Sequence, residues 1–279
     1  MRYWILVSIV TVGLAAGTLR ATEPDAKELA AKGYAAFKNV LEGDQAKLGE
    51  AIRYMEDSRK ADGTNVHNLF NLARAYFFEA GRFNKKESAV NAEQTLARVL
   101  EMAPDRVDAL SFHGSLLTQL SGGKDIAMFM RGVQEMNTAI ERAPNDITAR
   151  LVRAFTAGNF PPQALAAMGN YDPIGDLQFV ERAFDHFSSD FAPHADTVMK
   201  AYVGEAYKRK GDNEKALASF QAALNAAKPD DPGQLSGREV LDKMIAARMN
   251  GGEKALTSDP LFTSCHACHL SAPGKILPR

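Results

Sequence analysis

Both cysteines of the 279-residue chain lie near its C-terminal end, in the segment SCHACHL at residues 264 to 270. Cys265 and Cys268 are separated by two residues, and His269 follows directly. Thiols and an imidazole at this spacing can bind a metal ion, form a disulfide, or attach a cofactor covalently. Each of these chemistries predicts a different kind of protein.

The order Cys265, two residues, Cys268, His269 is the attachment sequence of c-type haem. This segment resembles the c-type cytochromes, and the resemblance covers only the motif. It implies one covalently attached haem c, held by thioether bonds to Cys265 and Cys268, with His269 as the proximal ligand of the iron. His266 has no role in this pattern.

The motif departs from the usual cytochrome arrangement, in which a haem pocket follows the motif and supplies a second axial ligand. Residues 270 to 279 contain neither His nor Met. A distal ligand must therefore come from the rest of the chain, from a partner or from water, or be absent. His186 and His194, which flank the predicted loop FSSDFAP, are the preferred candidates, and His67 and His113 are further ones.

Two other interpretations of the motif compete with haem attachment. A zinc site would draw on His266 as well, but four ligands within five consecutive residues cannot easily surround one ion. A disulfide between Cys265 and Cys268 would form readily in an oxidising compartment. Such redox pairs usually lie at a helix start in an alternation of strands and helices, and this sequence lacks that alternation.

The N-terminal residues predict export. Arg2 precedes an apolar run from Trp4 to Ala16, and small residues follow, as in a secretory signal peptide. The run is shorter than the roughly 20 residues that a membrane-spanning helix requires. We expect cleavage after Ala21 or after Gly17, which leaves no membrane span and places the protein in the periplasm or elsewhere outside the cytoplasm of a bacterium.

Helical periodicity dominates residues 25 to 250. In residues 199 to 231 small, aromatic and turn-forming residues fall at the spacings of the tetratricopeptide repeat: Gly204, Ala206, Tyr207, Gly211, Ala216, Phe220, Ala223, Leu224 and Pro229. This segment closely resembles that family. Small residues at Gly204 and Ala216 let two helices approach, while Gly211 ends the first helix.

Weaker copies precede this unit at residues 72 to 106 and 112 to 146, and further helical pairs are expected at 25 to 62 and 147 to 190. The closing stretches LEMAPD and IERAPN lie 40 residues apart, against 34 for the standard repeat. We therefore predict an all-α, TPR-like solenoid with lengthened inter-helix loops and a capping helix at 236 to 249. The expected divisions are a signal peptide (1–21), a repeat domain (22–250) and a connector with a haem-binding tail (251–279).

The first helix of each repeat lines the concave side of such an array. On the unit that starts near Val66 we expect this side to present His67, Phe70, Arg74 and Phe77. On the last unit we expect Glu205, Lys208 and Arg209. A surface that mixes aromatic and charged groups suits a protein or peptide ligand, although it is also compatible with ordinary solvated surface.

The sequence thus favours an exported electron-transfer protein whose repeats dock a protein partner, such as a redox protein. The alternative is a scaffold without haem, in which the tail cysteines form a disulfide or bind metal. A peroxidase-like haem enzyme is a third hypothesis, less favoured because no second catalytic group is identifiable. The formal net charge of −1 and the absence of a long basic run argue against a nucleic-acid partner.

Overall fold

A computed structural model of the chain describes residues 25–41, 44–158, 160, 162–169, 171–187, 195–227 and 237–251. Within these ranges the chain is built from helices and turns, with no β-strand. The all-α prediction is therefore confirmed. The predicted signal peptide and the tail from residue 252 onward lie outside the described residues.

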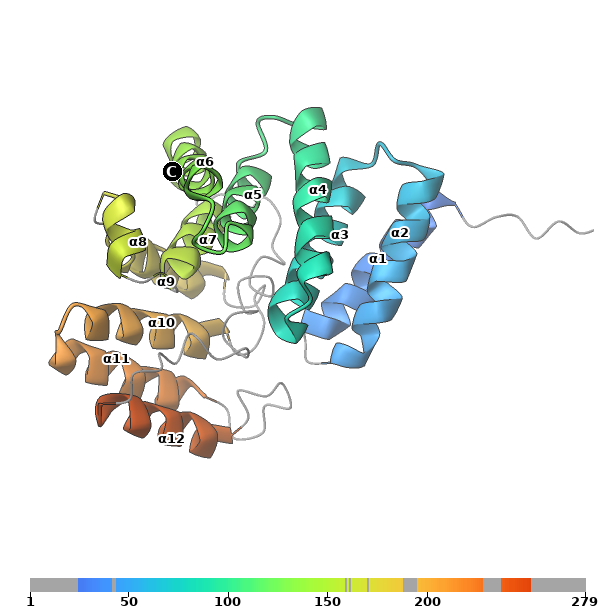
Figure 1. Ribbon diagram of the computed structural model, residues 1–279. Helices are drawn as coiled ribbons and strands as arrows, with labels where there is room; N and C mark the ends of the chain where they lie inside the picture. Colours follow the sequence, from blue (N-terminus) through green and yellow to red (C-terminus); the bar gives the residue numbers. More distant parts are fainter. Residues whose placement is uncertain are drawn as a thin grey trace, which may run out of the picture.

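The helices form hairpins in chain order (Figure 1). The pairs are α1 (Ala26–Leu41) with α2 (Leu48–Ala61), α3 (Val66–Phe83) with α4 (Lys86–Met102), α5 (Val107–Leu120) with α6 (Ile126–Arg142), α7 (Ile147–Gly158) with α9 (Ile174–Phe187), and α10 (Ala195–Arg209) with α11 (Asn213–Ala226). A 3-10 turn, η1 (Gln45–Lys47), precedes α2, the short α8 (Pro162–Ala167) interrupts the fourth unit, and α12 (Gly237–Met249) caps α11. In Figure 1 helix α4 stands upright, α1 and α2 run obliquely beside it, and α10 to α12 lie across the view, so the array twists along its length.

Local signals in the sequence set several helix starts. The side chains of Asn65, Asp125 and Asp212 each accept a hydrogen bond from a backbone N–H three residues on, at the start of α3, α6 and α11. Such caps satisfy N–H groups that have no partner within the helix. Two residues after the C-terminal end of α10, Gly211 has φ +80°, a left-handed conformation that glycine adopts without strain.

The TPR-like solenoid is confirmed, but the first units differ from the prediction in where their extra residues lie. Only Asn84 and Lys85 separate α3 from α4, and these helices have 18 and 17 residues. The helices, and not the loops, are lengthened there. The fourth unit follows the prediction more closely, because α8 occupies its inter-helix connection.

Glycines set how closely the helices of several hairpins approach. A Cβ added at Gly204 would lie 2.5 Å from the ring of Phe220, which confirms the predicted role of Gly204 in the last repeat. The contact is closer still between α5 and α6, where a Cβ at Gly132 would lie 2.4 Å from the backbone oxygen of Gly114. At this crossing the two backbones meet without a side chain between them.

We predict that Gly132→Ala destabilises the protein by about 1 to 3 kcal/mol, because the added methyl group meets backbone that cannot rotate away. Gly49 provides a matched control, since it lies in α2 with no atom within 4 Å of an added Cβ. Gly49→Ala should leave stability unchanged or raise it by about 0.5 to 1 kcal/mol through helix propensity. Urea unfolding followed by circular dichroism measures the free energy of unfolding of both variants. Equal changes for Gly132→Ala and Gly49→Ala would contradict the close crossing of α5 and α6.

One continuous apolar core runs from α1 to α12. Aromatic side chains join the first helices of successive units: Phe70 and Phe77 of α3 pack edge-on against Phe112 of α5, and Phe155 of α7 stacks on Tyr202 of α10. These contacts fix the relative position of neighbouring hairpins. Among the described helices, none has both the length and the hydrophobicity needed to cross a bilayer.

Candidate functional site

The predicted haem-attachment residues, Cys265, Cys268 and His269, lie outside the described residues, as does His194. His186 lies on α9, but its side chain is also outside the described part. In the part of the chain that the structure describes, no group of three or more His, Cys, Asp or Glu side chains could hold a metal ion.

His113, a weaker candidate for the distal ligand, is buried at the junction of three helices. Its Nδ1 lies 2.5 Å from Oε2 of Glu135 on α6, and its Nε2 lies 3.3 Å from Oε1 of Glu93 on α4. Only 1% of the residue is exposed, so neither ring nitrogen is open to an iron. His113 joins α5 to both neighbouring helices, and we withdraw it as a distal candidate.

The prediction that Phe70, Arg74 and Phe77 form an exposed partner surface is wrong. Their exposed fractions are 2%, 1% and 2%. The two phenylalanines pack against Phe112, as described above, and Arg74 Nη1 donates a hydrogen bond of 3.1 Å to Asn71 Oδ1. The repeat pattern placed these residues on the correct helix, but neighbouring first helices approach closely enough to bury them.

His67, in contrast, is exposed at the start of α3, with the ring of Tyr34 6.3 Å away. Partial burial, followed by the charges of Arg106 and Arg74, lowers the pKa of this imidazole, and Asp108 opposes the shift. A lowered pKa favours a neutral ring at neutral pH. The position of His67 is therefore compatible with contact to a partner.

Of the three residues predicted to line the concave side of the last unit, one is buried and two reach the surface. Glu205 is buried and accepts hydrogen bonds of 3.2 Å from Arg248, which joins the capping helix α12 to α10. Lys208 Nζ donates to Asn213 Oδ1, and Arg209 Nη1 donates to the backbone oxygen of Phe160. Arg209 is exposed and Lys208 is partly exposed, so both are available at the surface.

Six charged residues lie in or next to the N-terminal halves of α5, α7 and α9, and we call them the polar strip (Arg106, Asp108, Asp146, Arg150, Arg153 and Asp176). Arg106 forms a bidentate ion pair with Asp108 and stacks 3.9 Å above the ring of Phe70. Burial, with a smaller contribution from Asp108, raises the pKa of Asp146. The charges of Asp108 and Asp146 therefore interact between the start of α5 and the start of α7.

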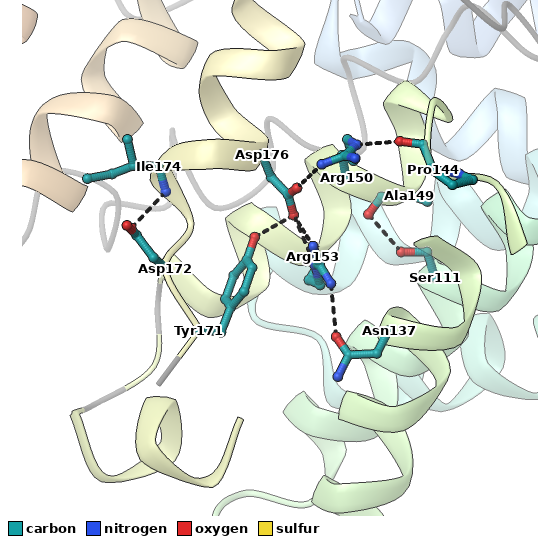
Figure 2. Close-up of polar contacts among 10 residues, drawn as sticks. All are labelled: Ser111, Asn137, Pro144, Ala149, Arg150, Arg153, Tyr171, Asp172, Ile174 and Asp176. Carbon is teal, nitrogen blue, oxygen red and sulfur yellow. Dashed lines mark hydrogen bonds and ion pairs between the residues drawn. The ribbon is translucent and has the colours of Figure 1, made fainter. Parts of the chain in front are cut away.

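The strip ends in a buried ion cluster around Asp176 (Figure 2). Asp176 is 3% exposed and accepts hydrogen bonds from Arg150 Nη1 at 2.5 Å, from Arg153 Nε at 2.9 Å and from the Tyr171 hydroxyl at 2.5 Å. Burial and the adjacent Asp176 carboxylate raise the pKa of Tyr171, so this phenol remains a donor. The cluster fixes α9 against α7.

This cluster was not predicted from the sequence, although two features of the sequence are consistent with it. Arg150 and Arg153 are three residues apart and share one face of α7, and Asp176 lies in the first turn of α9. Neither feature shows that the groups meet, because 23 and 26 residues separate Asp176 from the two arginines.

Comparisons with known proteins add little to this description. The sequence matches no protein-family model, and no curated protein matches it. A solved structure, the crystal structure of MamA protein, aligns with 72% of this chain and 91% of that chain, at 17% sequence identity and a TM-score of 0.40. The fold assignment rests on the hairpins and their packing.

Proposed function

We propose that this chain is an exported haem protein, in which one haem c is attached to the C-terminal tail and the helical array docks a protein partner for electron transfer. The observation that carries the proposal is the order Cys265, two residues, Cys268, His269. The apolar N-terminal segment supports it independently, because export is a requirement for the attachment of c-type haem.

The donor set suits the cofactor. The thiols of Cys265 and Cys268 form thioethers with the two vinyl groups of one porphyrin, and His269 supplies an imidazole nitrogen to the iron. When bound, the haem iron supplies reversible one-electron oxidation and reduction.

The array would supply the docking surface. Arrays of helical hairpins present extended faces that bind proteins or peptides. Among the predicted contacts His67, Lys208 and Arg209 are exposed or partly exposed, whereas the buried Phe70, Arg74 and Phe77 hold the array together. We therefore assign partner contact to the first three residues alone.

The decisive experiment expresses the full chain together with a cytochrome c maturation system and stains a denaturing gel for haem. We expect a stained band, because a covalently attached haem survives denaturation, and mass spectrometry should show that the first 17 or 21 residues are absent. A colourless protein with Cys265 and Cys268 oxidised would contradict the proposal and support the disulfide scaffold.

The absorption spectrum of the same material separates two roles for the haem. A six-coordinate, low-spin iron supports electron transfer and calls for a distal ligand such as His186 or His194. A five-coordinate, high-spin iron supports ligand binding or peroxide chemistry.

A further inference from the structure

A polar pocket of about 540 Å³ lies between α2, α3 and α4, and its lining includes no residue of the polar strip and no site residue predicted above. It is lined by Glu56, Arg59, Gly63, Leu69, Tyr76, Asn91, Gln94, Thr95 and Arg98. Its volume lies within the range of about 300 to 1,000 Å³ that is usual for small-ligand sites. Neither the haem nor partner docking accounts for this pocket.

Among the described residues that line the pocket, the one carboxylate, Glu56, is already engaged. Glu56 Oε1 accepts the Tyr76 hydroxyl at 3.0 Å, and its Oε2 accepts Nε and Nη2 of Arg59 at 2.9 and 2.6 Å. Burial and the neighbouring Glu56 raise the pKa of Tyr76, which keeps the phenol a donor to that carboxylate. Glu56 therefore orients Arg59 and Tyr76, and it offers little to a ligand that carries donors.

Donor groups around the pocket, by contrast, have capacity left. Arg98 uses Nη1 for Glu101 at 2.8 Å, and Arg59 uses Nε and Nη2 for Glu56. Among the described residues, the remaining guanidinium nitrogens of both arginines make no hydrogen bond, nor do the side-chain amides of Asn91 and Gln94. Asn91 and Gln94 are three residues apart and lie on one face of α4.

Since donors outnumber open acceptors, the complementary ligand is rich in acceptors. We propose that this pocket binds a carboxylate-bearing ligand, with the carboxylate held by Arg59 and Arg98 and the rest of the ligand by the amides of Asn91 and Gln94. Guanidinium groups match carboxylates in both charge and geometry. The amide oxygens of Asn91 and Gln94 can in addition accept hydrogen bonds from the rest of the ligand.

The carboxylate can belong to a small organic acid or to the C-terminus of a peptide. Titration calorimetry with succinate and with an acetylated tripeptide that has a free C-terminus distinguishes these sources, because the better-fitting source binds more tightly. Tight binding of either probe supports the proposal. Succinamide and the C-terminally amidated tripeptide should bind at least about 10-fold more weakly, since they lack the negative charge.

Arg98→Gln should weaken binding of the preferred probe by at least about 10-fold while the fold is retained, because its pair with Glu101 is exposed. Arg53→Gln is the matched control: Arg53 lies on α2 outside the pocket, with 60% of its side chain exposed, and the variant should bind normally. Thermal unfolding checks that both variants fold. Absence of binding by both acids at millimolar concentration, equal binding of the neutral analogues, or unchanged affinity of the Arg98 variant would each overturn the proposal.

Discussion

Replacing both tail cysteines, Cys265→Ser together with Cys268→Ser, is expected to abolish covalent haem completely. Each thioether requires a thiol, and the chain contains no other cysteine that could substitute. The variant should give no haem-stained band on a denaturing gel when it is expressed with the maturation system. Its helical circular dichroism should remain, because the array described from residue 25 to residue 251 includes neither cysteine.

His266→Ala serves as the matched control for this experiment. His266 lies between the two cysteines, and the proposed attachment gives it neither an anchoring nor an axial role. We expect full staining and an unchanged spectrum. If the double cysteine variant stains as strongly as the unmodified chain, or if His266→Ala alone removes the haem, then the assigned roles are wrong.

Asp176→Asn is expected to cost about 3 to 5 kcal/mol of unfolding free energy, the largest stability effect that we predict. The substitution keeps the shape of the side chain but removes the only negative charge that Arg150 and Arg153 share within the described ion cluster. Their side chains are only 21% and 15% exposed, so water replaces the lost carboxylate poorly. Urea unfolding followed by circular dichroism measures the change.

The same substitution at Asp57 provides the comparison. Asp57 pairs with Lys60 and Arg53 on the surface of α2, and 37% of its side chain is exposed. Asp57→Asn should cost less than about 1 kcal/mol, because exposed ion pairs contribute little. If Asp57→Asn and Asp176→Asn lower the free energy of unfolding equally, the buried cluster around Asp176 contributes no more to stability than an exposed ion pair.

Much of the fold follows from local features of the sequence. Apolar spacing gives the helices, Asn65, Asp125 and Asp212 begin three of them, and Gly211 follows the end of α10. The small residue at Gly204 gives the close approach of α10 to α11. These features act within one helix or one hairpin, so the sequence is sufficient to predict them.

The exposed surface was harder to predict, as Phe70, Arg74 and Phe77 show. Their position on the first helix of a repeat suggested a concave lining, yet less than 3% of each residue is exposed. The burial of these residues depends on the distance to the next hairpin, which the pattern of a single repeat does not contain. The same reason explains why His113, predicted as a possible iron ligand, lies between two carboxylates of neighbouring helices.

The sequence by itself determined the helical hairpins and the order Cys265, Cys268, His269 from which we propose haem attachment, because both depend on residues that are close together along the chain. Tertiary structure alone decided which polar groups meet. The packing of α9 against α7 brings Asp176 to its two arginines. The packing of α2, α3 and α4 brings together the residues of the polar pocket, among them Glu56, Arg59, Tyr76, Asn91 and Arg98. The energy of a buried charge depends on the distance and orientation of its partners, and these quantities are set only when the hairpins stack.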